Sequence, residues 1–467
     1  MNNGIRVLIL ERPFSPTVSF YIRFRHGAAQ EREGKTGAAH LLEHMMFKGT
    51  FTIGGKNPRR ERQLLRKIGK TGERLDREQE KAAQADRQQI ERLRKKLAKL
   101  QEEHRRWYRS NEIDRLYQEA GAAHLNASTS QDMITYHVSL PANRAELWAR
   151  IEADRMSEVV FREFYQERNV VLEERRQRTD ADPDGFLYER FVAAAFLNHP
   201  YRRPVIGWPA DIAGLQIQDL KELHHRLFAP SQMVITVVGA VRPKEMRRLL
   251  ERYFGALPAR PVERRLIAAE PPPRGERLIT VRFDAGERLI MGFPKPQPPS
   301  REDCVFDVIE SLLSRDRTSR FWRILVEERG LAESVRVING LPGSRFPNLF
   351  CISARVRHPH RLDELIAALE EQIAKLAAEP VTYAELEKVK NQLRADYLRR
   401  QDTNEGIAGE LSYHEALLGD YRYPYVYEEQ LSSITPSDII AAARKYLVPD
   451  NRVLAVMKKP LPPTRSR

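Results

Sequence analysis

The chain has 467 residues, more than one hydrophobic core usually supports, so the length predicts several domains. Apolar residues make up 41% of the sequence and charged residues 30%, as in water-soluble globular proteins, and no run approaches the roughly eighteen apolar residues of a membrane span. The two cysteines, Cys304 and Cys351, are too few for a disulfide framework, and their apolar neighbours favour buried thiols.

The strands and helices expected before the middle of the chain follow from its apolar patterns. Two runs rich in apolar and β-branched residues, 5–10 and 18–24, predict a hairpin of strands, and residues 126–140 predict one further strand. Helices are expected at residues 38–47, 111–120, 142–160, 163–177, 186–196, 218–226 and 243–253, with a buried strand at 233–238.

Most of the net charge of +14 lies in residues 56–109. This segment holds 19 Lys and Arg against 9 Asp and Glu, so it contributes +10 of the total. We expect an arm of two helices, broken near Gly69 and Gly72, that is either solvated or a docking surface for a partner. Its interleaved charges and few aromatic residues argue against nucleic acid as that partner.

A proline-rich segment, residues 258–277, is the best candidate for a linker, because it holds five prolines and much charge. It separates residues 1–257 from residues 278–467. The order of elements expected after it repeats the order before it, which indicates an internal duplication and an α+β fold. Strands are expected at 278–283, 288–293, 335–338, 349–356 and 453–457, and helices at 303–313, 318–329, 362–378, 383–397 and 408–418.

His40 and His44 lie four residues apart in the expected helix 38–47, so their side chains share one face. Two imidazoles in that geometry can bind one Zn²⁺ through ring nitrogens about 2.0–2.1 Å from the metal. Glu43 is offset on the same side, where it can take a proton from a water beside the metal. The helix is otherwise apolar, so these three polar residues indicate a zinc site, although paired helical histidines also occur without one.

The sequence around these histidines is similar to a known family. His26-Gly27-Ala28 and residues 34–39 precede the inverted motif His-x-x-Glu-His, and residues 45–50 follow it. This run closely resembles the pitrilysin-type metallopeptidases, or inverzincins, in their bacterial processing-peptidase-like branch. The resemblance implies two homologous α/β sandwich-like halves, as in the metallohydrolase fold of the mitochondrial processing peptidase and LuxS, with the charged arm inserted in the first.

The resemblance also implies the remaining site residues. The family has a glutamate as third zinc ligand on a later helix, with another glutamate seven residues before it, and Glu174 and Glu167 match that pair. Glu174 is thus the expected third ligand, with Glu167 behind the ligands, and Glu173 is the alternative register. Asn126 and Ala127 match the segment that leads into the strand pairing with substrate, so they are expected to bind substrate.

Two departures from the family pattern stand out. The separation of His44 from Glu174 is longer than usual, and the charged arm accounts for the excess; an arm that loops out would leave the site intact. Active relatives also carry an Arg and a Tyr in the second half that help to hold substrate in the transition state. Val326 and Glu333 stand at those positions here, so the expected oxyanion donors are missing.

These features together predict a zinc metalloendopeptidase that hydrolyses extended or unfolded peptides, with Zn²⁺ as cofactor and Glu43 as catalytic base. We expect it to be the zinc-bearing subunit of a heterodimer whose paralogous partner supplies the Arg and Tyr, or else a homodimer. The alternative is a non-catalytic or assembly subunit that retains a zinc site. Residues 1–6 show no secretory signal, which leaves the compartment open: the bacterial periplasm if a signal was removed, and otherwise the cytoplasm.

Overall fold

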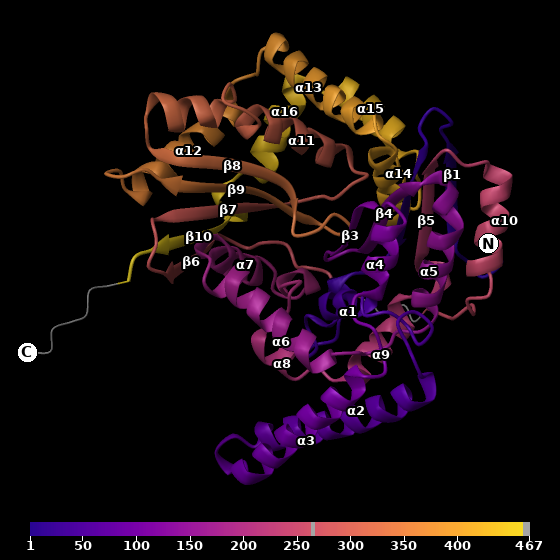
Figure 1. The fold of residues 1–467 in the computed structure, drawn as a ribbon. Coiled ribbons are helices and arrows are strands. Elements are labelled where there is room, and N and C mark those ends of the chain that lie inside the picture. Colours follow the sequence, from indigo (N-terminus) through magenta and orange to yellow (C-terminus); the bar gives the residue numbers. More distant parts are fainter. Residues whose placement is uncertain (263–266, 461–467) are drawn as a thin grey trace, which may run out of the picture. The chain divides into compact units, whose positions relative to one another are not determined.

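Two five-stranded mixed sheets organise the chain, one in each of two units of packing (Figure 1). The computed structural model describes residues 1–262 and 267–460. Because each unit draws on both halves of the sequence, neither is one continuous stretch of chain. The first unit comprises Met1–Arg175, Val205–Arg265 and Thr403–Ala416, and the second comprises Arg176–Pro204, Leu266–Asp402 and Leu417–Arg467.

The sheet of the first unit has the strand order β1-β5-β2-β4-β3. β1 and β5 are parallel and the other pairs are antiparallel. The bounds are β1 (Arg6–Glu11), β2 (Thr17–Phe24), β3 (Ala123–Thr129), β4 (Ile134–Pro141) and β5 (Met233–Gly239).

Two expectations about these strands are wrong. β1 and β2 do not form a hairpin, because β5, which is buried at every position, takes the place between them and pairs with both. Residues 126–140 are not one strand either. The chain reverses at residues 130–133, where the amide of Ser130 donates to the Met133 carbonyl (2.9 Å), so β3 folds back on β4 and becomes the edge of the sheet.

Helices cover the first sheet on both faces. Alternation along β2 turns Phe20 toward the main core, where its ring stacks on Trp148 at 4.2 Å, and turns Tyr21 toward the opposite face. Helices expected from the sequence occur here with small shifts in their ends. They are α1 (Ala38–Met46), α4 (Glu112–Glu119), α5 (Ala145–Ser157), α6 (Phe164–Arg175), α9 (Ile217–Leu227) and α10 (Pro243–Phe254). The short helix α8 (Pro209–Ala213) was not predicted from the sequence.

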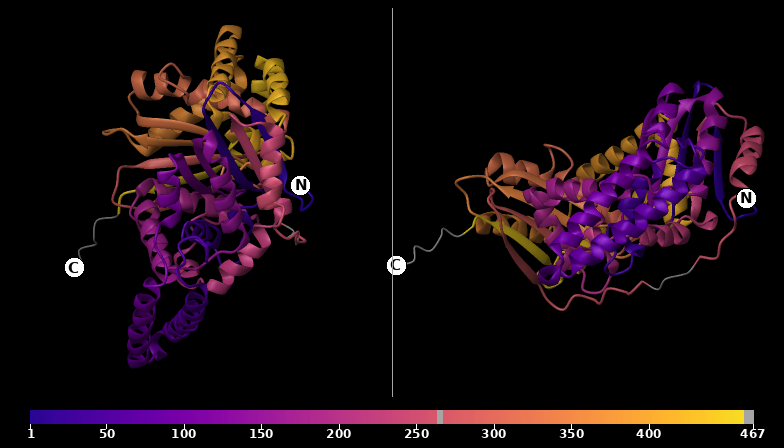
Figure 2. Two further views of the ribbon diagram at one scale, coloured as in Figure 1. Left: turned by 45° about the vertical axis from the view of Figure 1, so that its right-hand side comes forward. Right: turned by 60° about the horizontal axis from the view of Figure 1, so that its bottom comes forward.

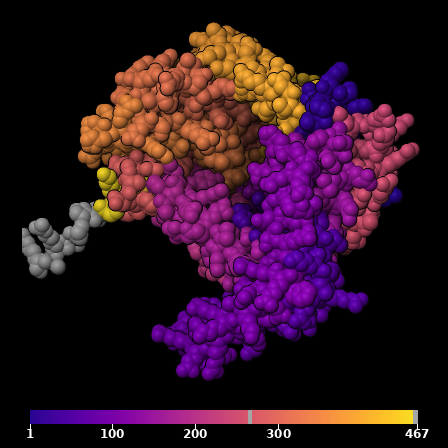
Figure 3. All heavy atoms as spheres, in the orientation of Figure 1, coloured from indigo at the N-terminus to yellow at the C-terminus, as the bar shows by residue number. Residues whose placement is uncertain are grey.

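The charged arm is a pair of helices, α2 (Pro58–Glu80) and α3 (Arg87–Arg105), that run side by side (Figures 1 and 2). In Figure 3 the arm projects from the rest of the first unit as an indigo-to-purple surface. The expected break at Gly69 and Gly72 is wrong, because both lie inside α2 and the chain turns at residues 81–86. A Cβ on Gly72 would lie 1.9 Å from Cζ of Tyr165, so this glycine lets α2 approach α6 closely.

The sheet of the second unit, with the order β6-β10-β7-β9-β8, has the same topology as the first. The parallel pair again lies at one edge and the other pairs are antiparallel, which confirms the internal duplication and the α+β class. The bounds are β6 (Arg277–Arg282), β7 (Arg288–Lys295), β8 (Ala332–Leu341), β9 (Asn348–Val356) and β10 (Val453–Lys458).

The helices of the second unit include two that the sequence did not predict, α15 and α16. Both helices have a proline in the first turn, where the missing N–H of proline breaks no helical hydrogen bond. A proline in the interior of a helix would instead interrupt it, so these prolines concealed the helices in the sequence. The expected helix 318–329 is a π-helical turn over Trp322–Glu328. The helices are α7 (Pro183–Ala195), α11 (Arg301–Ser314), α12 (Leu362–Ala378), α13 (Tyr383–Gln401), α15 (Tyr423–Ser433) and α16 (Pro436–Tyr446).

Each half of the sequence gives one helix to the other half's sheet. α7 packs on β6, β7 and β10, and a Cβ on Gly292 would lie 2.4 Å from Cζ of Phe191 in α7. α14 (Asn404–Leu418) returns to the first unit, where Ile407 and Ala408 pack with Tyr21 and Val238. The units of packing therefore cross the boundaries 1–257 and 278–467 at two places.

Three further expectations from the sequence concern the cysteines, membrane-spanning helices and the proline-rich segment. Cys304 and Cys351 are buried free thiols, as expected. None of the described helices is long and apolar enough to cross a membrane. Residues 258–262 and 267–276 of the proline-rich segment contain no helix or strand, and residues 263–266 lie outside the described residues.

Candidate metal centre

Hydrogen bonds and close packing hold the N-terminal end of α1 in place. The Glu31 carboxylate, which is buried, accepts hydrogen bonds from the amides of Gly37 (3.1 Å) and Ala39 (2.7 Å) and so satisfies two donors of the first turn. Gly37 has φ 85°, and a Cβ there would lie 2.5 Å from the Ile206 carbonyl oxygen. These contacts fix the direction of the helix that carries His40 and His44.

His40, His44 and Glu174 converge between α1 and α6. Nε2 of His40 lies 3.7 Å from Oε2 of Glu174, and Nε2 of His44 lies 3.6 Å from the same oxygen. One potential ligand atom from each of the three residues lies within 4.8 Å of the others. Donors around tetrahedral Zn²⁺ lie about 3.3 Å apart, so small side-chain shifts would complete the site. Glu173, the alternative register, is exposed and does not belong to this group.

Glu167 lies behind His44 rather than among the converging atoms. Its Oε2 is 3.4 Å from Nδ1 of His44, the ring nitrogen that faces away from Glu174, and Lys48 forms an ion pair with the carboxylate. Burial alone would raise the pKa of Glu167, but the hydrogen bonds from His44 and Lys48 outweigh it and lower the pKa. A carboxylate in this place fixes the tautomer and the ring orientation of a metal-binding histidine.

Glu43 lies beside the converging residues and receives a hydrogen bond from the Thr129 hydroxyl. Burial raises the pKa of Glu43, and the Thr129 hydrogen bond and the nearby His44 offset part of that rise. The sequence did not single out Thr129. Successive residues of a strand point to opposite faces, so Thr129 lies on the same half-buried face of β3 as Ala127. This alternation is the sequence signal that could have identified Thr129 as a site residue.

Within the described part of the chain, β3 is the edge strand of its sheet, and it lies beside this cluster. It pairs with β4 on one side and ends the sheet on the other, and β3 also packs against α1. Asn126 is exposed and Ala127 half-buried on this strand. The structure therefore places both predicted substrate residues on a free strand edge, which is the feature that strand addition by a peptide requires.

The arm is bonded to the helix that carries Glu167 and Glu174. Arg168 of α6 donates two hydrogen bonds to Asp76 of α2, each 2.9 Å, and a third to the Leu215 carbonyl (2.9 Å). Just before α6, Arg162 donates two more to Glu61 of α2 (2.6 and 3.1 Å). The arm therefore does not simply loop out of the unit, because its buried ion pairs brace the helix behind the candidate metal site.

Family models match most of the chain in two parts. The model described as insulinase (peptidase family M16) matches residues 6–99 and 104–208, and the model described as peptidase M16 inactive domain matches residues 214–393. The chain belongs to peptidase family M16. The residues that match the first model include α1 and α6, and those that match the second include most of the second unit.

Curated relatives and solved structures agree with that family. The chain is 25% identical to the zinc protease PqqE of Helicobacter pylori over 98% of this chain and 92% of the relative. It is 22% identical to the "Probable mitochondrial-processing peptidase subunit beta" of Schizosaccharomyces pombe, over 96% and 88%. The crystal structure of a protease from Helicobacter pylori has the same fold, with a TM-score of 0.81, 23% identity and 98% coverage of both chains.

The positions where active members of the family are expected to carry Arg and Tyr offer no matching donors in this M16 chain. Val326 is buried in the π-helical turn, and Glu333 is exposed on β8. A valine donates no side-chain hydrogen bond, and an ionised glutamate only accepts them. Any stabilisation of an oxyanion by donors must therefore come from other groups than these two.

Proposed function

We propose that this M16 chain is a zinc metalloendopeptidase, in which His40, His44 and Glu174 bind Zn²⁺ and Glu43 is the catalytic base. The observation that carries the proposal is the convergence of the two imidazoles and the Glu174 carboxylate, with Glu43 beside them and bound to Thr129. Two nitrogens and one carboxylate oxygen are the ligand set of many catalytic zinc sites, which keep one position open.

Bound zinc would polarise the peptide carbonyl and acidify the attacking water. The Glu43 carboxylate would accept the proton of that water and then give it to the leaving amine. The Thr129 hydroxyl holds the carboxylate in one orientation for this transfer. Glu167 holds the ring of His44, so that its Nε2 points toward Glu174.

The substrate class we propose is an extended or unfolded peptide. An extended segment can add to the free edge of β3 by backbone hydrogen bonds, which makes binding tolerant of sequence. Asn126 and Ala127 lie on that edge, in the same strand as Thr129, which donates to Glu43. The short side chains of exposed Asn126 and half-buried Ala127 leave room for varied substrate side chains.

We further propose that the chain works as the zinc-bearing subunit of a pair. Val326 and Glu333 replace the expected Arg and Tyr, so a paralogous M16 subunit would supply these donors. The name of the Schizosaccharomyces pombe relative, which is a subunit of a processing peptidase, is consistent with such a pair. A homodimer that uses other donors is the alternative arrangement.

The experiment that tests this function measures cleavage of unstructured quenched peptides by the zinc-loaded chain, alone and mixed with a paralogue that carries the Arg and Tyr. Turnover that a chelator abolishes and zinc restores supports the peptidase. Turnover only in the mixture supports the pair. No turnover in either sample, with zinc bound, would contradict the peptidase and favour a non-catalytic assembly subunit.

A further inference from the structure

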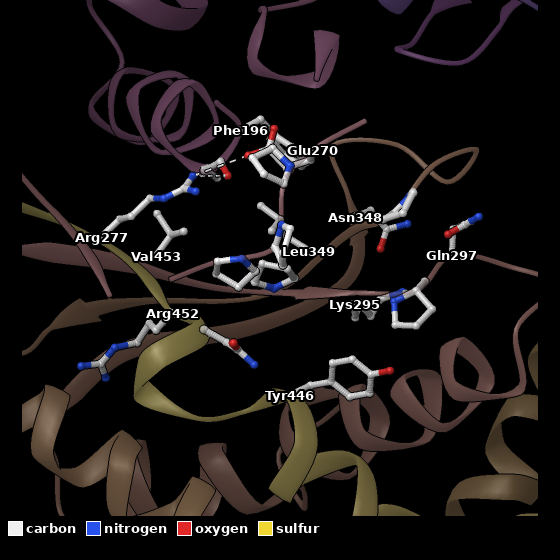
Figure 4. A pocket seen from close by; sticks show the side chains of 18 of the residues that line it. Phe196, Glu270, Arg277, Lys295, Gln297, Asn348, Leu349, Tyr446, Arg452 and Val453 are labelled. Atoms are coloured by element: carbon white, nitrogen blue, oxygen red, sulfur yellow. Dashed lines mark hydrogen bonds and ion pairs between the residues drawn. The ribbon is translucent and has the colours of Figure 1, made fainter. Parts of the chain in front are cut away.

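The second unit contains a cavity of about 340 Å³ that has no part in the peptidase chemistry proposed above. It lies among the end of α7, residues 271–275, the end of β7 and the first residues of β9 and β10 (Figure 4). Phe196, Leu349 and Tyr446 contribute to its apolar lining, together with the prolines of the 271–273 segment. All of its lining residues belong to the second unit.

One wall of the cavity is the proline-rich segment, and Glu270 holds it in place. The Glu270 carboxylate accepts hydrogen bonds from three successive backbone amides, of Leu197 (2.8 Å), Asn198 (2.9 Å) and His199 (3.1 Å). This clamp fixes Pro271, Pro272 and Pro273 against the chain that follows α7. The wall is therefore a bonded part of the unit, and the cavity it borders is built into the fold.

The cations around the cavity are already engaged. Lys295, whose side chain is fully buried, forms an ion pair with Asp303 and donates to the Pro296 carbonyl (2.9 Å). Arg277 donates to the carbonyl oxygens of Ala194 (3.0 Å) and Ala195 (2.9 Å) at the end of α7. Arg452 is likewise paired with Glu276 and Glu370. A ligand of this cavity would meet no uncommitted charge among these three, so the site fits an uncharged molecule.

Asn348 is a buried polar residue in the wall of this cavity. Its side chain lines the cavity, the residue is only 1% exposed, and neither Oδ1 nor Nδ2 has a hydrogen-bond partner within the described part of the chain. In Figure 4 the amide is turned toward the space that Leu349 and Tyr446 also border. Leaving a buried amide unpaired destabilises a fold, so such a group calls for an explanation.

We propose that this cavity binds a small, uncharged, mainly apolar molecule that carries a lactam or carboxamide edge. An amide of this kind shows an N–H and a carbonyl side by side. Its N–H would donate to Oδ1 of Asn348 and its carbonyl would accept from Nδ2, so both orphan atoms would be satisfied at once. Apolar parts of the molecule would pack on the proline rings, Phe196 and Tyr446.

The size of the cavity favours a small molecule over a protein segment. Ligand cavities span roughly 300–1,000 Å³, so this one lies at the lower end of that range. A cyclic dipeptide such as cyclo(Leu-Pro) matches the required chemistry, because its cis amide gives the paired donor and acceptor and its proline ring and leucine side chain are apolar. We therefore take cyclo(Leu-Pro) as the probe.

The test titrates cyclo(Leu-Pro) into the full chain by isothermal calorimetry, with Asn348→Leu as the variant and Asn391→Leu as its control. Asn391 is an exposed asparagine on α13. We expect saturable 1:1 binding to the wild type and to the control, and at least tenfold weaker binding to Asn348→Leu. Equal binding by Asn348→Leu, or no saturable binding to the wild type, would overturn the proposal. Tighter binding of the linear peptide acetyl-Leu-Pro-amide would overturn the cyclic-amide class and indicate a peptide site.

A second measurement needs no ligand. Because the Asn348 side chain has no hydrogen-bond partner among residues 1–262 and 267–460, Asn348→Leu should leave the melting temperature unchanged or raise it. A fall of several degrees would show that the amide is already bonded within the fold and would overturn the proposal independently of the probe. Neither outcome depends on peptidase activity, so this inference can fail while the proposed function stands.

Discussion

Asp76 of the arm accepts two hydrogen bonds from Arg168, which lies one residue after Glu167 on α6. Both residues are buried, and the side-chain Nε2 of Gln216 also donates to Asp76 (2.8 Å). The segment inserted between the candidate metal ligands is thus bonded to the helix that carries one of them. The arm therefore has a structural role at the site, beyond any docking role of its exposed charge.

Asp76→Ala should destabilise the protein and weaken zinc retention. The substitution leaves the Arg168 guanidinium buried without its carboxylate, which costs about 3 kcal/mol in comparable pairs. Unfolding in urea and the zinc content after dialysis measure the two effects. Glu80→Ala, at an exposed position of the same helix, is the control. Equal stability and zinc content in the two variants would show that the arm does not brace α6.

Thr129→Val should lower kcat/KM about tenfold while zinc content stays at the wild-type level. The isosteric change removes the hydroxyl that donates to Glu43 and leaves the volume of the side chain intact. Thr129→Ser keeps a hydroxyl and should recover most of the rate. If Thr129→Val cleaves peptides as fast as Thr129→Ser, the hydroxyl does not orient the base.

Glu174→Gln should lose zinc far more readily than Glu173→Gln. The first change removes a carboxylate from the converging cluster, and the second alters an exposed residue outside it. Zinc content after exposure to a mild chelator measures the difference between these adjacent substitutions. The assignment of Glu174 as third ligand fails if the two variants retain equal zinc.

Asp307→Asn should stabilise the protein at pH 8 and have little effect near pH 4. Burial, followed by the neighbouring Asp303 carboxylate, raises the pKa of Asp307 to about 7 in the folded chain. A folded-state pKa above the unfolded value means that wild-type stability falls as pH rises from about 4 to about 7. The neutral amide avoids that loss, so we expect a gain of up to about 4 kcal/mol above pH 7.

Urea unfolding of wild type and Asp307→Asn across this pH range checks the prediction. The Asn339 amide can still donate to the substituted side chain, as it donates to Asp307 (2.8 Å). Asp402→Asn, at an exposed position, should show no pH-dependent gain. A gain that is equal at pH 4 and pH 8 would mean that Asp307 is not protonated in the folded state at low pH.

Local patterns in the sequence predicted much of the fold and the core of the site. The spacing of His40 and His44 on an apolar helix predicted their shared face, because helical geometry depends only on nearby residues. The repeated order of elements predicted the duplication that the two sheets confirm. The resemblance of Glu167 and Glu174 to the family pair predicted two residues that the structure places beside His44.

Features that depend on contacts between residues far apart in the chain could not be predicted from local sequence patterns. Nothing local to β1 and β2 indicates that β5 lies between them, since strand order depends on contacts across the whole sheet. The role of Gly72 depends on Tyr165, which is far from it in the chain, so a close approach was misread as a break. The contact of Thr129 with Glu43 and the unpaired amide of Asn348 likewise appear only after folding.

The central claim is that Glu43 moves the proton in a zinc-dependent cleavage of peptides. Its most direct test compares the zinc content and peptide turnover of wild type and Glu43→Gln under conditions in which the wild type cleaves. The amide keeps the size of the side chain but cannot act as a base, so we predict full zinc content and at least a hundredfold loss of turnover. Wild-type turnover by Glu43→Gln with zinc bound would contradict the account.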